Sequence, residues 1–226
     1  SRRRHTRSLC DWSSDVCSSD LLAAIRQEIL GYCLHAAEIC SPCSILSLSV
    51  PTGGGKTLSS LAFALKLAAR HQLRRIIYVA PYLSILDQNA RVFRQALETS
   101  DQGNLILEHH SLSDLGLESG TEEESDPYAA RRVGNWEAPI ILTTNVQFFE
   151  SLFASSPGTC RKLHHIAGSL VILDECQALP KELLKPTSRM LQNYAQYLKT
   201  TFLFCTATQP AWHLAGLQEQ IGRAHV

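Results

Sequence analysis

The sequence predicts an α/β fold, with a doubly wound and mainly parallel sheet flanked by helices. Six short runs are rich in Ile, Leu and Val, and most of them lack the two-residue alternation of half-buried strands, which indicates strands buried on both faces. Helix-length segments separate these runs. Because alternating strands and helices are typical of parallel sheets, the two observations together define this class.

The elements follow one another in a regular order. A helix is expected over 22–40, where apolar residues recur at helical spacing with Gly31 as the one interruption. Pro186 is expected to bend or interrupt the last of the later helices, because proline removes a backbone donor. The predicted strands are 44–50, 74–80, 104–109, 139–144, 169–175 and 200–208. The predicted helices between them are 56–70, 83–98, 146–154 and 181–198.

Both ends of the chain are expected to be foreign to the domain. Residues 10–21 match the translation of a sequencing-library adapter, and residues 221–226 match part of the same oligonucleotide read from the opposite strand. Segments of this kind are excluded from an argument about fold. We therefore expect a non-native tail at 1–21, one domain at 22–220 and a second tail at 221–226.

Length and composition indicate what class of protein the chain belongs to. The 226 residues are 45% hydrophobic and 19% charged, with a formal net charge of +0, which suits one globular domain. No apolar run is long enough to span a bilayer and no signal-peptide core follows the basic start, so no membrane is expected and the cytoplasm is the default location. Without the predicted tails the chain is slightly acidic, so binding to nucleic acid would depend on groups placed locally in a cleft.

Cysteine and histidine spacing gives little support for a zinc site. Of the 8 cysteines, Cys40 and Cys43 form a lone CxxC motif without a second pair of ligands at a suitable spacing. His109 and His110 are interpreted as structural, since adjacent residues on a strand point to opposite faces. The same interpretation applies to the histidine pair at 164–165.

The stretch SVPTGGGKTLSS, residues 49–60, is the first motif with a chemical meaning. It contains the Gly-Lys-Thr of a phosphate-binding loop, but Val50 stands where the consensus has its leading glycine. The loop follows a predicted buried strand and opens a helix whose apolar face is expected to include Leu58, Leu61 and Leu65. This context favours a phosphate loop over a glycine-rich surface turn.

The chemistry of such a loop assigns roles to its residues. Successive glycines let backbone N–H groups turn toward one anion, and the N-terminus of the following helix adds a partial positive charge. Lys56 would meet the β and γ phosphates of ATP, and Thr57 the Mg²⁺ ion. The candidate nucleotide-binding residues of the loop are Pro51, Thr52, Gly53, Gly54, Gly55, Lys56 and Thr57.

Two further motifs stand at the ends of predicted strands. Asp174 and Glu175 follow a buried run at its carboxyl end, where ligands bind in open parallel sheets. Asp174 is placed to hold Mg²⁺ and Glu175 to orient and deprotonate the attacking water, as hydrolysis of a nucleoside triphosphate requires. Thr206 and Thr208 end another strand, and their hydroxyls can hydrogen-bond back to the acidic motif or to Gln177.

From about residue 25 to residue 212, the chain resembles the first RecA-like domain of a superfamily-two helicase. More closely, it resembles the CRISPR-associated helicase-nuclease of type I interference systems. The resemblance implies a RecA-like phosphate-loop fold and an ATP-dependent helicase that unwinds and translocates along DNA, with a nuclease in the intact protein. The segments that carry it are RQEIL, VPTGGGKTLSSLAFAL, IIYVAPYLSILDQNARVF, LEHHS, NWEAPIILTTNVQFFESLFA, CRKLHHIAGSLVILDECQALP and CTATQP.

The resemblance also implies roles for individual residues. Gln27 becomes a candidate for reading the adenine edge, with a solvent-facing helix glutamine as an equal alternative. The implied catalytic residues are Lys56, Asp174, Glu175 and Gln177, and the implied magnesium-binding residues are Thr57 and Asp174. The residues implied to couple hydrolysis to movement are Thr206 and Thr208, and those implied to contact single-stranded DNA through its backbone are Pro81, Tyr82, Leu83, Thr143, Thr144 and Asn145.

The resemblance implies partners as well. They are single-stranded DNA, an RNA-guided surveillance complex, and a second RecA-like domain and a His-Asp nuclease domain in the intact chain. No His-Asp dipeptide occurs in this sequence, and the second RecA-like domain would follow Trp212. The chain by itself is therefore expected to bind nucleotide weakly and to hydrolyse it poorly.

Several alternatives remain open. Another superfamily-two translocase, of restriction or repair, would lack the VQFFESLF and EHHS segments. A non-hydrolysing nucleotide-binding scaffold is the alternative that is not an enzyme, whereas the Asp-Glu pair and the Thr-Ala-Thr strand disfavour a small-molecule kinase. Cys176 is either a redox switch beside Glu175 or, as we expect, a small buried filler.

Overall fold

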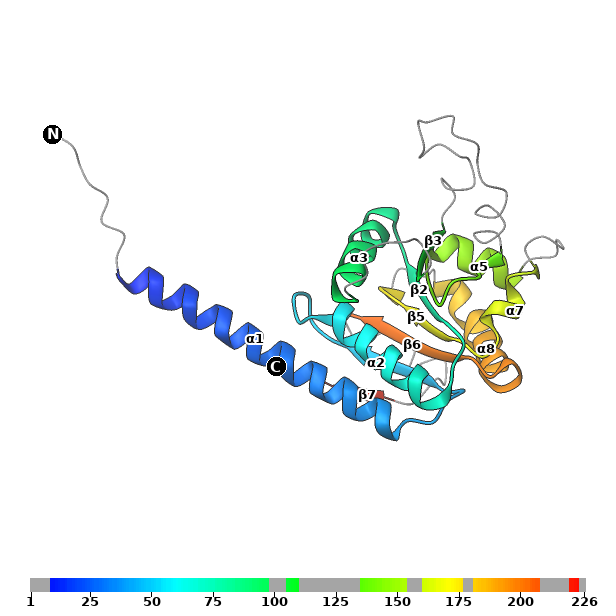
Figure 1. Ribbon diagram of the computed structural model, residues 1–226, viewed down its shortest axis with the longest axis horizontal. Coiled ribbons are helices and arrows are strands. Elements are labelled where there is room, and N and C mark those ends of the chain that lie inside the picture. The colour runs from blue at the N-terminus through cyan, green and yellow to red at the C-terminus, as the bar shows by residue number, and fades with distance from the viewer. Residues whose placement is uncertain are drawn as a thin grey trace, which may run out of the picture.

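The computed structural model describes residues 9–97, 105–109, 135–153, 160–176, 181–207 and 220–223. These residues form a seven-stranded sheet in the order β3-β4-β2-β5-β6-β1-β7, with helices on both sides (Figure 1). All of the strand pairings in the described part of the chain are parallel. The predicted fold class, a doubly wound and mainly parallel sheet flanked by helices, is therefore confirmed.

Most elements lie close to the predicted ranges, but α1 begins at Leu9 instead of residue 22, and α7 was not predicted. The strands are β1 (Ile45–Ser49), β2 (Ile76–Ala80), β3 (Ile106–His109), β4 (Ile140–Thr144), β5 (Leu170–Leu173), β6 (Thr201–Thr206) and β7 (Gln220–Arg223). The helices are α1 (Leu9–Ile39), α2 (Lys56–His71), α3 (Leu83–Ala96), α5 (Asn145–Phe153), α7 (Leu163–Ile166) and α8 (Lys181–Leu198).

Both faces of the sheet are buried, because successive residues of a strand point to opposite sides. In β2, Tyr78 belongs to a core cluster shared with α1, α2 and α3. Its neighbours Ile77 and Val79 belong to a second cluster, on the face covered by α5 and α8. Every residue of β2, β4, β5 and β6 is buried. This double burial explains why continuous apolar runs mark the strands in the sequence.

Helix α2 buries a different stripe from the predicted one. Leu61 is buried as expected, but Leu58 and Leu65 are 48% and 37% exposed. The buried face holds Phe63, Ala64 and Leu67, which recur at the helical spacing that faces the sheet. The prediction was wrong for Leu58 and Leu65 because a leucine-rich helix does not by itself reveal which stripe meets the core.

Of the bend or interruption expected at Pro186, the interruption was wrong and the bend stays a prediction. Helix α8 runs through this residue without a break. Proline in a helix costs about 3 kcal/mol, but Pro186 lies near the start of α8 and removes one hydrogen bond there. Further along the same helix, Leu191 and Ala195 are buried in the second core cluster. Packing of that later part offsets the local cost, so the helix continues.

Helix α1 packs against α2 through its C-terminal half. Glu38 forms an ion pair with Lys66 at 2.6 Å, and the Ala37 carbonyl accepts a hydrogen bond from Arg70 at 3.4 Å. Ile29 and Cys33 of the same half are buried in the first core cluster. The N-terminal half extends away from the body of the domain (Figure 1).

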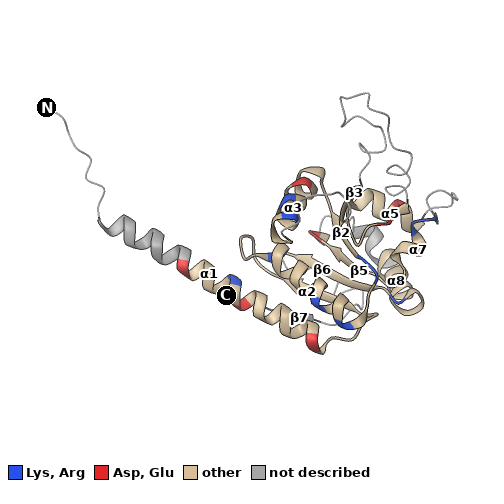
Figure 2. Cartoon of the chain, viewed as in Figure 1, with Lys and Arg blue, Asp and Glu red and all other residues tan. Residues whose placement is uncertain are grey.

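Strand β7 was not predicted. It pairs in parallel with β1 at the edge of the sheet, and its residues 221–223 fall within the predicted second tail. The division into a tail at 1–21, a domain at 22–220 and a tail at 221–226 stays a prediction. Lys and Arg residues are spread over several elements in the view of Figure 2. Across the described ranges, no helix combines the length and apolarity needed to cross a membrane.

Candidate nucleotide-binding site

The glycine-rich loop connects β1 to α2 at the carboxyl edge of the sheet. Gly53 and Gly55 have φ angles of 83° and 78°, in the left-handed region that favours glycine. At Gly54, an added Cβ atom would lie 2.7 Å from a Val50 methyl carbon and 3.1 Å from the Pro51 carbonyl oxygen. All three glycines are therefore required by the shape of this loop, two by conformation and one by space.

The position of Val50 explains its departure from the consensus. Val50 is 1% exposed and belongs to the first core cluster, and its backbone N–H donates to the Thr206 carbonyl at 3.1 Å. Its side chain fills the space next to Gly54. A bulky residue is thus accommodated where the consensus has glycine, because it points into the core and away from the concave side of the loop.

Lys56, the first residue of α2, contacts two carboxylates. The Lys56 ammonium is 2.9 Å from Asp174 Oδ1 and also contacts the Glu175 carboxylate. Burial on its own would lower the pKa of Lys56, but the charge of Asp174 and hydrogen bonds to both acids outweigh it, and the pKa is raised. The ammonium therefore stays charged at neutral pH, and the two predicted motifs meet in one site.

Asp174 is a buried carboxylate whose two oxygens have separate partners. Oδ1 accepts from Lys56 and from the Glu175 backbone N–H at 2.9 Å. Oδ2 accepts from the Tyr78 hydroxyl at 2.5 Å, and Asn89 Nδ2 donates to the same hydroxyl oxygen at 2.8 Å. Burial, followed by the charge of Asp174, raises the pKa of Tyr78 well above its usual value, so the phenol remains the donor.

Glu175 has an unusual backbone conformation. Its φ angle is 47°, in the left-handed region that few residues other than glycine adopt. The turn directs its side chain toward Lys56, although its neighbour Cys176 is 1% exposed and part of the second core cluster. Strained residues of this kind cluster at functional sites, where the surrounding structure holds them in place.

Thr206 ends β6 next to the loop. The register of the parallel pair places Thr206 opposite Ser49, the last residue of β1. Thr206 is fully buried, and its carbonyl holds the start of the loop through Val50. The structure thus brings one of the two predicted coupling threonines to the site. Thr208 and the predicted catalytic Gln177 lie outside the described residues.

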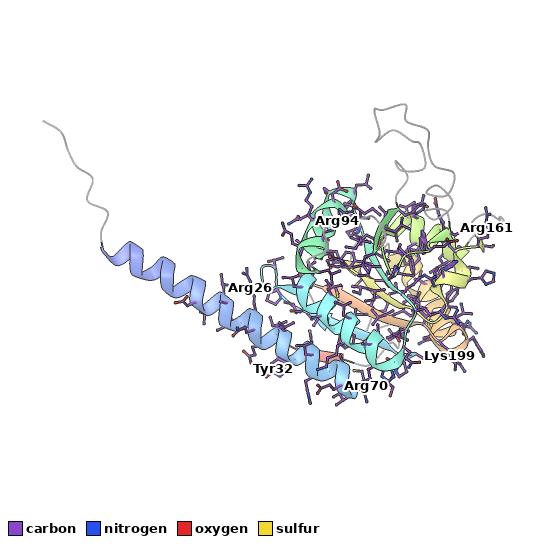
Figure 3. The ribbon with its side chains drawn as sticks, viewed as in Figure 1. Arg26, Tyr32, Arg70, Arg94, Arg161 and Lys199 are labelled. Carbon is purple, nitrogen blue, oxygen red and sulfur yellow. The ribbon has the colours of Figure 1, made fainter. Side chains whose placement is uncertain are left out.

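Gln27, the candidate for reading the adenine edge, is exposed on α1. The residue before it, Arg26, donates from Nε to the Gly53 carbonyl at 3.0 Å, and its Cγ lies 3.3 Å from where a Cβ on Gly55 would stand. Figure 3 shows Arg26 on α1, next to the loop that precedes α2. Sequence reasoning missed this contact, because nothing in the RQEIL segment distinguishes an arginine that reaches the loop from one that faces solvent.

The two turns predicted to contact DNA leave the same edge of the sheet. The register pairs Ala80 with Thr144, so the β2–α3 and β4–α5 turns are neighbours. Tyr82 is 63% exposed, whereas Thr143 and Thr144 are buried. Thr144 Oγ1 accepts a hydrogen bond of 3.4 Å from the Gln147 backbone N–H in the first turn of α5.

The remaining candidates of the two turns differ in exposure. Pro81, Leu83 and Asn145 are partly buried. The hydroxyls of Thr143 and Thr144 are enclosed by the protein, which leaves Tyr82 as the most accessible side chain of the set. The assignment of these residues to DNA binding stays a prediction.

Two of the residues interpreted as structural, Cys176 and His109, are buried. Burial raises the pKa of the Cys176 thiol to about 12. His109 is 1% exposed and lies 3.4 Å from the Lys162 ammonium, while His110 lies outside the described residues. Within the described ranges, no group of three or more His, Cys, Asp or Glu side chains could hold a metal ion.

A glycine-rich loop that opens a helix beside paired carboxylates, at the carboxyl edge of a parallel sheet, defines a phosphate-loop nucleotide-binding domain. The model of the DEAD/DEAH box helicase family matches residues 28–215. The chain belongs to this family.

A curated relative places the chain more narrowly. It is 36% identical over 182 residues to the CRISPR-associated nuclease/helicase Cas3 of Haloferax volcanii, a match that covers 74% of this chain. The aligned part spans 19% of that relative's length. The resemblance to the CRISPR-associated helicase-nuclease is confirmed, as is the prediction of a helicase motor domain of the ATP-dependent class.

Solved structures show the same fold. The structure of T. fusca Cas3 with ATP matches with a TM-score of 0.64 at 18% identity, covering 79% of this chain and 20% of that one. The ADP complex of the same protein gives a TM-score of 0.62 at 19% identity, covering 76% of this chain and 19% of the other. The Pyrococcus furiosus Hef helicase domain gives 0.54 at 18% identity, covering 86% and 36%.

Proposed function

We propose that this chain is the ATP-binding motor domain of a DNA helicase that acts in type I CRISPR interference. The observation that carries this proposal is the contact of Lys56 with Asp174 and Glu175, which joins the phosphate loop and the acidic motif in one site. The similarity to the Haloferax volcanii protein supports the interference context. Single-stranded DNA, an RNA-guided surveillance complex, a second RecA-like domain and a His-Asp nuclease are the proposed partners, and the cytoplasm is the proposed location.

The residues present fit a nucleoside triphosphate with Mg²⁺. The loop leaves no room for a Cβ at Gly54, and Gly53 and Gly55 have the positive φ angles with which successive backbone N–H groups can turn toward one anion. Asp174 supplies the carboxylate oxygens that Mg²⁺ prefers, and Thr57 supplies a hydroxyl at the start of α2. When bound, Mg²⁺ would neutralise charge that develops on the phosphates.

The ion pairs of Lys56 suggest how the site accepts its ligand. The β and γ phosphates are stronger anionic partners for Lys56 than a single carboxylate, so their binding would draw the ammonium away from Asp174 and Glu175. Asp174 would then be available to hold Mg²⁺, with Thr57, and Glu175 to orient and deprotonate the attacking water. Gln177 is proposed to act with them as a catalytic residue, and Thr206 and Thr208 are proposed to couple hydrolysis to movement.

A lysine substitution tests the nucleotide site. In the 226-residue chain we expect Lys56→Ala to abolish ATP binding measured by isothermal titration calorimetry, because the phosphates lose their side-chain cation. Lys66→Ala is the matched control, since Lys66 lies on the same helix and pairs with Glu38 on α1 instead. Equal ATP affinity of Lys56→Ala and the parent chain would contradict the proposed site.

A second measurement separates the motor from a scaffold. We expect the complete protein that contains this domain to hydrolyse ATP faster when single-stranded DNA is present, and Glu175→Gln to lose hydrolysis while it retains ATP binding. The physical reason is that an amide cannot deprotonate water. Binding of ATP without DNA-stimulated hydrolysis by the complete protein would favour the scaffold alternative.

A further inference from the structure

We propose that Tyr78 and Asn89 are positioning residues that hold Asp174 in the orientation required for Mg²⁺, so that the metal site depends on the place of helix α3. This inference rests on the proposed nucleotide-binding function. Neither residue was a candidate from the sequence, and both are buried behind the site rather than exposed at the loop.

Two hydrogen bonds join Asn89, Tyr78 and Asp174, and the chemistry of the three groups fixes which one donates in each bond. A carboxylate carries no proton, so the Tyr78 hydroxyl must donate to Asp174 Oδ2, at 2.5 Å. The hydroxyl oxygen is then free to accept, and the Asn89 amide nitrogen donates to it at 2.8 Å. Donation to an ionised acceptor makes the first of these bonds one of the strong class.

The two oxygens of Asp174 divide their partners between the site and the core. Oδ1 faces Lys56 and the Glu175 backbone N–H, on the side of the loop. Oδ2 faces Tyr78 on β2, a strand that neighbours β5 in the sheet. The contact with Tyr78 therefore does not compete with Lys56, and it persists if a ligand draws Lys56 away. A carboxylate held at one oxygen presents the other in a fixed direction, which is how buried partners tune a metal ligand.

Helix α3 contacts Tyr78 at two separate points. Asn89 reaches the hydroxyl, and Phe93, one turn further along, packs edge to face on the Tyr78 ring with centroids 5.1 Å apart and planes at 78°. Asn89, Ala90 and Phe93 are buried on the same face of the helix. A shift of α3 along the sheet would thus move the phenol and, through it, the carboxylate. Helix α3 begins directly after Tyr82, the most exposed of the residues proposed to contact DNA.

The test measures metal affinity in the 226-residue chain, with Mn²⁺ as the probe for Mg²⁺ and electron paramagnetic resonance to count free Mn²⁺ in the presence of ATP. Tyr78→Phe keeps the ring and removes only the hydroxyl. We expect its Mn²⁺ dissociation constant in the ternary complex to rise by about 10-fold, the lower end of the range for loss of such a partner. Its ATP affinity in EDTA should equal that of the parent, because Lys56 and the loop are unchanged.

Two further variants keep the result interpretable. Tyr194→Phe is the matched control, because it removes a hydroxyl that donates to the Leu152 carbonyl at 3.3 Å, away from the site, and should leave Mn²⁺ affinity unchanged. Asn89→Leu keeps a similar volume, and a smaller rise in the dissociation constant is expected because the phenol still donates. Melting temperatures show that each variant is folded.

The outcomes separate this inference from the proposed function. If the parent chain binds ATP with Mn²⁺ and Tyr78→Phe binds Mn²⁺ equally well, the inference is overturned and the proposed function stands. If Tyr78→Phe loses ATP affinity in EDTA as much as in Mn²⁺, the residue has a general structural role and the inference is overturned too. Failure of the parent chain to bind ATP at all overturns both.

Discussion

At the scale of single residues, the loop requires glycine at position 54 for reasons of space. We expect Gly54→Ala to weaken ATP binding strongly, because its Cβ would lie 2.7 Å from Val50 and 3.1 Å from a backbone oxygen. Gly31→Ala is the control, since no atom lies within 4 Å of its added Cβ. That change should stabilise α1 by about 0.5–1 kcal/mol. Calorimetry measures the ATP affinity of both variants, and urea unfolding measures their stability. An ATP affinity of Gly54→Ala equal to that of the parent would contradict the observed loop shape.

The thiol of Cys176 provides a residue-scale prediction about redox sensitivity. Burial raises its pKa to about 12, so the reactive thiolate is scarce at neutral pH and increases only as the pH rises toward that value. We expect Cys176 to resist alkylation by iodoacetamide at pH 8 in the folded chain and to react once the chain is denatured.

The partly buried Cys160 serves as the internal comparison for this labelling. Mass spectrometry of the labelled peptides distinguishes the two sites. Rapid labelling of Cys176 in the native chain would revive its interpretation as a redox switch beside Glu175.

At the scale of elements, the strand-to-helix turns at the carboxyl edge of the sheet determine where DNA would bind. We expect Tyr82→Ala to lower affinity for a single-stranded oligonucleotide, because stacking of a base on an aromatic ring contributes about 1–3 kcal/mol. Its ATP affinity should not change, since Tyr82 follows β2, and β5 and β6 separate β2 from β1, the strand that leads into the loop.

The chain contains a matched control for this prediction. Tyr197 is also highly exposed, at 72%, but it lies at the end of α8 just before β6 begins, on the opposite edge of the parallel sheet. Fluorescence anisotropy with a labelled oligonucleotide should show weaker binding for Tyr82→Ala and unchanged binding for Tyr197→Ala. Equal losses in both variants would remove the carboxyl edge as the preferred surface.

Strands, and contacts at the ends of strands, could be predicted from the sequence, whereas buried polar contacts between elements could not. Each predicted strand has a counterpart. The clearest predictions are β2, β4, β5 and β6, because a strand buried on both faces is apolar along its whole length and the sequence shows this directly. The meeting of Lys56 with Asp174 was also predictable, since the carboxyl ends of parallel strands share an edge. The link from Asn89 through Tyr78 to Asp174 was not, because which buried polar groups meet across elements depends on register and helix placement.

The errors have a similar physical origin. Leu58 and Leu65 satisfied the helical period but lay on the wrong stripe, since the side of α2 that meets the sheet is set by the loop before it. Pro186 satisfied the rule for a helix breaker, yet tertiary packing of α8 overrode it. The contact of Arg26 with the loop was missed, because the sequence does not show which face α1 presents to Gly53. Local patterns predict elements well, and the relative rotation of packed elements poorly.

At the scale of the whole molecule, the long helix α1 tests the proposed domain boundary. Its contacts with the body lie in the second half, where Arg26 reaches the phosphate loop and Glu38 pairs with Lys66. The first half extends away from the sheet (Figure 1), and Leu21 and Leu22 at its end are 63% and 45% exposed. Residues 10–21, within this first half, are also those that match the adapter translation.

We expect a shortened chain without residues 1–21 to keep the melting temperature and ATP affinity of the parent, because the contacts that α1 makes are retained. Removal of residues 1–40 should lower both. It would delete Ile29 and Cys33 and expose the core residues that they cover, at a cost of about 25 cal/mol per Å² of apolar surface, and would also remove the hydrogen bond from Arg26 to Gly53. Differential scanning calorimetry with and without ATP measures both quantities. A clear loss of stability on removal of residues 1–21 alone would show that they belong to the folded domain, against the proposed boundary.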